Sequence, residues 1–194
     1  MDNNYIFQYW EAIQDGTVTV GKWIKTIYKI LVNGLKSGKW DFDEEKANKA
    51  INFIENFCHH SEGRNDLLKL ELWQKAIVSA IFGIIDKRTG YRQFREVFIV
   101  VARKNGKTLF AAAIAAYMAY IDGEYGAKVC FLVPKLDQAD LVYDAFYQIV
   151  QADDELDSIT KKRRSDIYIK EFNTSVKKIA FNSKKSDGFN PQMV

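Results

Sequence analysis

The sequence predicts an α/β fold in which a helical N-terminal region leads into a parallel β-sheet flanked by helices. Apolar residues in the first seventy positions recur at helical spacing, as in the series Val20, Ile24, Ile27, Leu31 and Leu35. From residue 96 onward, apolar runs of strand length alternate with helical segments, which is the pattern of parallel βαβ units. A polar stretch over residues 61–66 is the best candidate for a linker. We therefore expect a helical lead-in over residues 1–65 and a second domain over residues 66–194.

The helices of the lead-in follow from its apolar spacing and its capping residues. The first helix covers the apolar series and is expected to end at Gly34 and Gly38. Asp41 or Asp43 can cap the second helix, whose inner face we expect to carry Ala47, Ala50, Ile51, Ile54 and Phe57. A third helix is predicted over about residues 71–85, followed by a turn over residues 87–90.

The second region alternates strands and helices. The continuous apolar run Val97–Val101 predicts a strand that is buried on both faces. An alanine-rich helix is predicted over residues 107–122, and a second buried strand over residues 127–133, which Pro134 stops. Another helix is predicted over residues 136–150. This order predicts that a ligand binds at the carboxyl ends of the strands.

The remaining residues predict additional strands. Residues 167–172 and 176–181 are expected to pair across a turn at Asn173-Thr174. Met193 and Val194 follow a polar loop and resemble the first residues of another buried strand. We therefore expect the sheet to be incomplete at the C-terminus of this chain.

The most informative motif lies between the first predicted strand and the alanine-rich helix. Residues 102–108 read Ala-Arg-Lys-Asn-Gly-Lys-Thr, and a strand, a tight loop ending in Gly-Lys-Thr and a helix are the layout of a phosphate-binding loop. Backbone N–H groups at a helix N-terminus point at an anion, and the helix dipole favours negative charge there. Gly106 allows close approach of a phosphate, Lys107 can reach the β and γ phosphates, and the Thr108 hydroxyl can bind Mg²⁺. The leading glycine of such loops is replaced by Val101.

Three further loop residues each have two interpretations. Arg103 can neutralise phosphate charge or can pair with a surface carboxylate. The sequence does not determine whether Arg103 or Lys104 faces the ligand. Asn105 can donate a hydrogen bond to a phosphate or can adopt a left-handed turn.

The composition is that of a globular chain. Of the 194 residues, 47% are apolar and 27% are charged, and the net charge of +3 permits a nucleic-acid partner without requiring one. No apolar run has the length of a bilayer span and no signal-peptide pattern is present, so we expect a cytoplasmic location and no membrane partner. Cys58 and Cys130 make no disulfide framework, and we interpret Cys58-His59-His60 as a helix end rather than a metal site.

Four segments together resemble the N-terminal part of the large terminase subunit of tailed bacteriophages, the ATP-driven motor that packs DNA into capsids. They are Leu72-Trp73-Gln74, residues 98–108 with Arg-Lys-Asn-Gly-Lys-Thr and no leading glycine, residues 122–139, and Ser-Asp-Gly-Phe-Asn-Pro at 186–191. The likeness reaches back to the helices around residues 40–42 and 53–55, so it spans nearly the whole chain. In this family the position of Val101 is not a glycine, so the resemblance accounts for that departure.

The resemblance implies a RecA-like P-loop ATPase core that binds ATP and Mg²⁺. Lys107 matches the phosphate-binding lysine, Thr108 the magnesium-binding hydroxyl, and Arg103 a basic residue that senses or stabilises the γ-phosphate, so Arg103 and Lys107 are the expected catalytic residues. Gln74 matches the adenine-contacting glutamine, whose amide offers one donor and one acceptor. The alternative for Gln74 is a helix start beside a core tryptophan. The other loop residues are also expected to bind the nucleotide: Lys104, Asn105 and Gly106.

The resemblance also implies partners. They are double-stranded DNA bound through its phosphate backbone, a portal protein, a small terminase subunit and further copies of the chain, in the cytoplasm of the bacterial host. The cation run 161–164 would contact DNA phosphates, together with Lys177, Lys178, Lys184 and Lys185; the alternative is a solvated surface.

Two other interpretations stay open. A helicase-like P-loop NTPase unrelated to packaging would fit Gln74 and Gln138 equally well, and a truncated remnant would fold without catalysing anything. In the family, an acidic pair that completes the Mg²⁺ shell and activates water follows soon after the Asn-Pro segment, and Val194 precedes any such pair. We therefore expect an ATPase as the full-length protein, and weak nucleotide binding and poor turnover by this chain alone.

Overall fold

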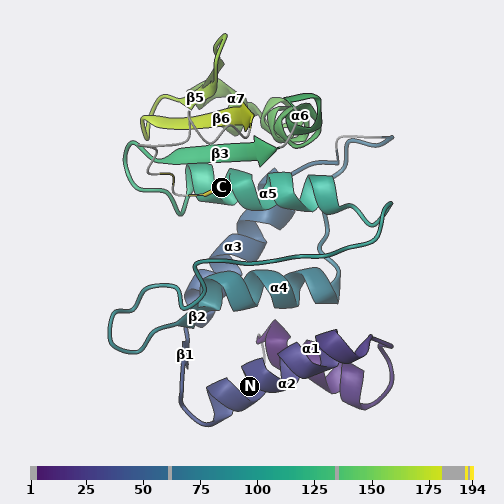
Figure 1. Ribbon diagram of the computed structural model, residues 1–194. Helices are drawn as coiled ribbons and strands as arrows, with labels where there is room; N and C mark the ends of the chain where they lie inside the picture. The colour runs from purple at the N-terminus through teal and green to yellow at the C-terminus, as the bar shows by residue number, and fades with distance from the viewer. Residues whose placement is uncertain (1–3, 61–62, 134–135, 181–190, 192) are drawn as a thin grey trace. The chain divides into compact units, whose positions relative to one another are not determined.

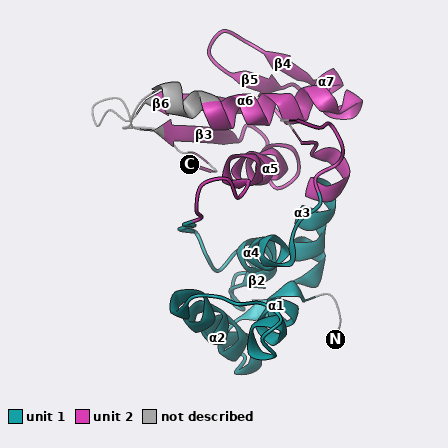
Figure 2. Cartoon of the chain, turned by 90° about the vertical axis from the view of Figure 1, so that its right-hand side faces the viewer, with its two compact units in different colours: residues 1–53, 69–100 teal, residues 54–68, 101–194 magenta. Residues whose placement is uncertain are grey.

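The chain divides into two compact units. The computed structural model describes residues 4–60, 63–133, 136–180, 191 and 193–194, without the side chains of residues 133, 136–140 and 180. Unit 1 comprises residues 1–53 and 69–100, and unit 2 comprises residues 54–68 and 101–194 (Figure 2). The domain boundary expected near residue 65 does not follow this grouping and stays a prediction. Among the described residues, no helix combines the length and the apolar character of a bilayer span.

Unit 1 is a helical unit with a small antiparallel sheet. It contains α1 (Tyr5–Gln14), α2 (Lys22–Lys36), most of α3 (Glu44–Phe57), α4 (Leu72–Gly83), β1 (Asp41–Phe42) and β2 (Ile84–Ile85). Its core joins three helices and β2 through Ile6, Tyr9, Ile13, Tyr28, Leu31, Val32, Ala76 and Ile84. Asp43 rather than Asp41 caps α3, because its carboxylate accepts the Lys46 N–H at 3.0 Å.

The end of α2 differs from the sequence prediction. Gly34 lies inside the helix and does not end it, since α2 continues to Lys36. Gly34 is required because the Trp40 ring lies against it, so that a Cβ added there would overlap the ring. Trp40 in turn meets Phe94 edge-on, with the ring centroids 5.4 Å apart. Gly38 follows the helix with φ at +69°, in the left-handed region.

The apolar series of α2 faces the core only in part. Leu31 is buried, whereas Ile24 and Ile27 are 40% and 51% exposed. The buried side of the helix instead passes through Tyr28 and Val32. The inner face predicted for α3 is confirmed at Ala47, Ala50, Ile51 and Ile54, while Phe57 is half-buried.

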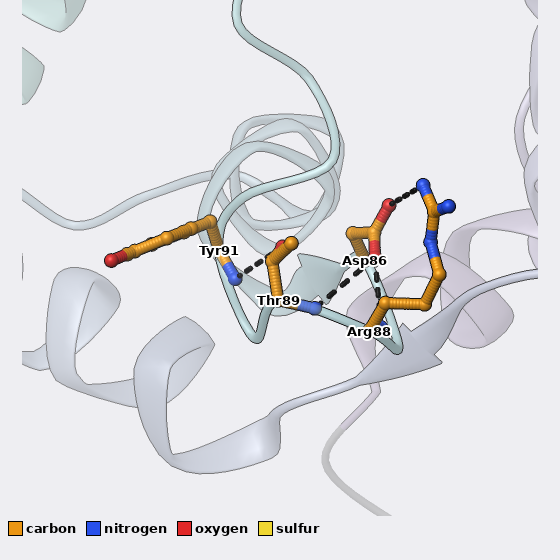
Figure 3. Close-up of polar contacts among 4 residues, drawn as sticks. All are labelled: Asp86, Arg88, Thr89 and Tyr91. Atoms are coloured by element: carbon orange, nitrogen blue, oxygen red, sulfur yellow. Dashed lines mark hydrogen bonds and ion pairs between the residues drawn. The ribbon is translucent and has the colours of Figure 1, made fainter.

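The turn predicted over residues 87–90 is confirmed. The Asp86 carboxylate accepts the N–H of Arg88 at 2.8 Å and of Thr89 at 3.3 Å (Figure 3). The N–H of Tyr91 donates to the Thr89 hydroxyl at 3.3 Å. Hydrogen bonds from the Arg88 N–H, and then from its side chain, hold the pKa of the Asp86 carboxyl below its ordinary value. After the turn the chain runs back along β2, and Arg92 forms an antiparallel β-bridge with Ile85.

Unit 2 is an α/β unit built on a mixed sheet with strand order β3-β6-β5-β4. The strands are β3 (Lys128–Val133), β4 (Thr160–Lys162), β5 (Ile167–Ile169) and β6 (Thr174–Ala180). Helices α5 (Lys107–Tyr120) and α6 (Leu136–Ala152) pack against β3, β6 and each other, and α7 (Asp154–Ile159) follows α6 (Figure 1). The predicted α/β class is confirmed. The sheet is mixed rather than wholly parallel, because β5 and β6 form an antiparallel pair while β3 and β6 are parallel.

The strand predicted over Val97–Val101 is wrong. In the described chain this segment belongs to no strand, and Phe98 and Val100 are 93% and 78% exposed. A strand that is buried on both faces needs neighbouring strands and covering helices, and none of the described segments pairs with this one.

Met193 lies beside β3. It forms a parallel bridge with Val129, and its carbonyl accepts the Cys130 N–H at 2.8 Å. A strand-like start at Met193 therefore agrees with the sequence prediction. The segment 186–190, which carries part of the family resemblance, lies outside the described residues.

The close contact at Gly34 generates a prediction about stability. Gly34→Ala should lower the free energy of unfolding by about 1–3 kcal/mol, because the added methyl group must displace the Trp40 ring. Asn33→Ala is the matched control, since Asn33 is exposed on the same helix and alanine favours helices. Urea denaturation of the two variants checks this, and equal stability of both would contradict the packing described for Trp40.

Candidate phosphate-binding site

The predicted phosphate-binding loop is attached to a helix with little exposed surface. In α5, Phe110 and every residue from Ala112 to Tyr120 are buried. Alanines make up much of this surface, so α6 and the sheet can approach the helix axis closely. A helix that is apolar on all sides is typically buried on all sides. In α5, the exposed part is therefore the first turn. Lys107 is exposed and Thr108 is half-buried in that turn.

The start of α5 has no side-chain cap. Gly106 occupies the N-cap position with φ +66° and ψ +16°, in the left-handed region, and no side chain accepts a hydrogen bond there. The first intrahelical bond is from the Phe110 N–H to the Gly106 carbonyl at 2.9 Å. The N–H groups of Lys107, Thr108 and Leu109 therefore have no acceptor within the helix. Such a terminus can bind an anion. The Leu109 N–H is one of the three candidate donors, and the sequence did not single out this residue.

The loop is held by Asn105. Its side-chain amide donates to the carbonyls of Ala102 and Arg103, both at 3.2 Å. The left-handed residues are its neighbours, Lys104 with φ +67° and Gly106. Asn105 thus braces the loop, and neither of its two sequence interpretations describes this arrangement. No sequence signal could have identified Lys104 as a left-handed residue, since lysine rarely adopts this conformation.

The glycine at position 106 is required by its backbone conformation. A Cβ built on Gly106 would meet no atom within 4 Å. Crowding inside the chain is therefore not the reason for glycine there, and the positive φ is.

The loop surface is cationic. Arg103, Lys104 and Lys107 are all exposed. No carboxylate among the residues that the structure describes forms an ion pair with any of the three. The alternative that Arg103 pairs with a surface carboxylate therefore has no support in this part of the chain.

Gln74 lies in unit 1, whereas the loop belongs to unit 2. Gln74 is 8% exposed and forms a capping box at the start of α4. Its Oε1 accepts the Glu71 N–H at 2.9 Å, and the Glu71 side chain accepts the Gln74 N–H. Gln74 therefore lies at a helix start, as one of its two sequence interpretations expected. An adenine contact would have to use the second lone pair of Oε1 and the amide N–H groups.

Two cations of the run 161–164 lie over tyrosine rings. The Lys162 Nζ lies 4.0 Å from the Tyr147 ring centroid, and the Arg163 guanidinium lies 3.4 Å from that of Tyr168. Lys161 and Arg164 are exposed. Lys184 and Lys185 lie outside the described residues.

Cys58 and its two histidines follow the end of α3. Burial, and to a smaller extent the charge of Asp153, raises the pKa of the Cys58 thiol to about 12. Cys130 is buried in β3, as expected for a small apolar residue.

Comparison with known proteins identifies similar sequences and structures. The family model "Terminase large subunit, ATPase domain" matches residues 72–194, which is more than half of the chain. The crystal structure of the bacteriophage HK97 large terminase is similar, with a TM-score of 0.64 and 23% sequence identity over 75% of this chain. This chain spans 29% of the length of that protein. No curated protein matches the chain. The structural likeness confirms the expected RecA-like fold class.

The loop conformation generates a second prediction about stability. Gly106→Ala should lower the free energy of unfolding by roughly 1 kcal/mol, because a Cβ is unfavourable at positive φ. Lys104→Ala should change it by less than about 0.5 kcal/mol, because lysine already carries a Cβ at nearly the same φ. Chemical denaturation of both variants checks this. A larger loss of stability for Lys104→Ala than for Gly106→Ala would contradict the left-handed conformation as the reason for glycine at position 106.

Proposed function

Since the chain belongs to the terminase large subunit ATPase-domain family, we propose that it supplies the nucleotide cradle of a viral DNA-packaging motor. The observation that carries the proposal is the uncapped start of α5, where backbone N–H groups without helical acceptors lie beside three exposed cations. A triphosphate is the ligand whose charge and oxygen acceptors complement that arrangement.

Each residue of the loop has a role in this proposal. The N–H groups after Gly106 donate to phosphate oxygens, and Lys107 neutralises the β and γ phosphates. Arg103 neutralises the charge that develops on the γ-phosphate during transfer, which makes Arg103 and Lys107 the proposed catalytic residues. Lys104 adds positive charge at the rim. Asn105 acts through the loop, because its amide is bonded to two loop carbonyls.

Thr108 is the proposed magnesium-binding residue. Its hydroxyl lies in the first turn of α5, next to Lys107, and a hydroxyl oxygen is a suitable ligand for this hard cation. Bound Mg²⁺ would supply charge neutralisation at the β and γ phosphates. We also propose that Gln74 contacts adenine.

We propose that the sheet of unit 2 contributes a surface that contacts DNA. The register places Lys161 opposite Tyr168, Tyr168 opposite Ser175, and Ser175 opposite Lys128. Residues opposite one another share a face of the sheet, so two exposed lysines lie at the ends of one polar row. We assign this row to contacts with the phosphate backbone, which suit a motor that must act on any sequence.

We propose that the complete packaging motor is formed by the full-length terminase. ATP hydrolysis that powers packaging is proposed for the full-length terminase, with the portal protein, the small terminase subunit and further copies of the chain as partners, in the host cytoplasm. Residues 1–65 are the proposed lead-in, and residues 66–194 the proposed ATPase portion. Family membership favours this function over a helicase-like NTPase.

Nucleotide binding tests the proposal. Calorimetry with a non-hydrolysable ATP analogue and Mg²⁺ should give weak binding, and Lys107→Ala should weaken it about tenfold or more, because a charge-assisted phosphate contact is lost. Lys170→Ala, an exposed lysine on another loop, should bind like the parent chain. Absence of binding in all three would favour the remnant interpretation, and equal binding in all three would contradict the cradle.

DNA binding tests the polar row separately. The double variant Lys128→Ala/Lys161→Ala should reduce the slope of log K against log salt for random-sequence duplex DNA by about 1.8, or roughly 0.9 per lost contact. Lys25→Ala/Lys49→Ala removes the same charge from exposed positions on α2 and α3 and is the control. Equal slopes for the two double variants would exclude a specific role for the row.

A further inference from the structure

Arg163 follows β4 directly, on the face of the sheet that carries the polar row. Its N–H donates to the Asp166 carbonyl at 2.8 Å, so the two residues lie opposite each other and close the turn between β4 and β5 (Figure 2). This continues the register that pairs Lys161 with Tyr168. Side chains two positions apart on a strand point to the same face. Arg163 and Asp166 therefore lie on the same face as Lys161 and Tyr168.

Two contacts hold the Arg163 side chain. Its guanidinium carbon lies 3.4 Å from the centroid of the Tyr168 ring. Its Nε lies 3.9 Å from the Asp166 Oδ1, so the two side chains form an ion pair. The ring is itself fixed, because the Tyr168 hydroxyl donates to the Asn173 Oδ1 at 2.8 Å. The guanidinium is therefore held in one orientation before a ligand binds.

Asp166 is a buried partner for an exposed arginine. The Asp166 side chain is 7% exposed, whereas that of Arg163 is 42% exposed. The Asp166 Oδ1 has no hydrogen-bond partner within the described part of the chain. A buried carboxylate oxygen in this state strongly favours a nearby cation, which Arg163 supplies. The carboxylate thus holds the guanidinium in place without leaving a negative charge exposed on the surface.

The unused part of the guanidinium indicates the class of ligand. The carboxylate lies nearest to Nε, which leaves the two terminal amino groups of Arg163 for another acceptor. Neither amino group forms a hydrogen bond or an ion pair with a residue that the structure describes. A planar pair of N–H donors matches two oxygens of one phosphate group.

The neighbouring cations lack this arrangement. Successive residues of a strand point to opposite faces, so Lys162 lies on the other face, where its Nζ is 4.0 Å from the Tyr147 ring centroid. Arg164 is exposed, and it has no ion pair or ring contact with any described residue. Within the run 161–164, Arg163 is therefore the cation that combines a fixed orientation with the face of the polar row.

We propose that Arg163 binds one phosphate group of the DNA backbone through its two terminal amino groups, and that Asp166 and Tyr168 are positioning residues that act through it. The inference rests on the proposed contact of the polar row with DNA. It adds a directional contact to a surface of exposed lysines. It also implies that a carboxylate, Asp166, strengthens binding of a polyanion, since pre-organisation of a long side chain lowers the entropy cost of binding.

Fluorescence anisotropy on the whole 194-residue chain tests the role of Arg163. The probe is a fluorescein-labelled DNA duplex of random sequence. Arg163→Lys keeps the charge and removes the planar fork, so it should weaken binding about fivefold or more. Arg164→Lys makes the same change at the adjacent residue and should bind like the parent chain.

Asp166→Asn gives the sharper test, because two interpretations predict opposite signs. If Asp166 only offsets the positive charge of the surface, the loss of its charge should tighten binding of DNA. Our proposal expects binding about threefold weaker or more, since the guanidinium loses its pre-organisation. Glu171→Gln removes an exposed carboxylate after β5 and is the matched control, which should bind as tightly as the parent chain or more tightly.

A double variant separates positioning from damage to the fold. Arg163→Ala/Asp166→Asn should bind no more weakly than Arg163→Ala, because Asp166 acts only through the arginine. Tyr168→Leu should likewise weaken binding only while Arg163 is present. A substitution that merely disturbed the hairpin would weaken binding in both backgrounds, and that result would contradict the positioning roles.

The remaining outcomes distinguish this inference from the proposed function. Failure of the parent chain to bind DNA would overturn the DNA surface, and this inference with it. DNA binding that depends on Lys128 and Lys161 but is unchanged by Arg163→Lys, or tightened by Asp166→Asn, would overturn the inference alone. Weaker binding of the ATP analogue by Arg163→Lys, with DNA binding unchanged, would assign the guanidinium to a nucleotide phosphate and would also overturn it.

Discussion

Burial of α5 is the constraint on which the candidate site depends. Its alanine-rich surface lets α6, β3 and β6 approach closely, so the helix is enclosed from Phe110 onward and cannot rotate to hide its first turn. The N–H groups of that turn have no helical acceptors. Positive charge at Lys107 and from the helix dipole adds to them. The same packing that stabilises unit 2 thus leaves free the helix terminus that we propose binds an anion.

Unit 1 follows a different packing logic. Its core is formed by α1, α2 and α4, and the contact of Trp40 with Gly34 sets how closely the chain can return across α2. This arrangement leaves Trp23 and Ile27 of α2 exposed.

Much of the secondary structure could be predicted because helical periodicity and caps are local. The predicted helices over residues 107–122 and 136–150 agree with α5 and α6 to within two residues at each end. The run Val97–Val101 could not be placed in the same way. An apolar run shows that a segment would gain from burial, but a strand also needs a neighbour in register, which its own residues do not encode. The exposure of Ile27 has a related cause, because helical spacing identifies an apolar face without identifying what covers it.

For the site, the sequence alone determined the position of the loop, the start of α5 and the identity of its cations, because Gly106, Lys107 and Thr108 are defined by spacing. The tertiary structure decided how those residues are held. It placed Lys104 in a left-handed conformation, directed the Asn105 amide to two loop carbonyls, and engaged Gln74 in a capping box. Side-chain chemistry is a property of each residue, whereas hydrogen-bond partners and burial depend on which other segments the fold brings alongside it.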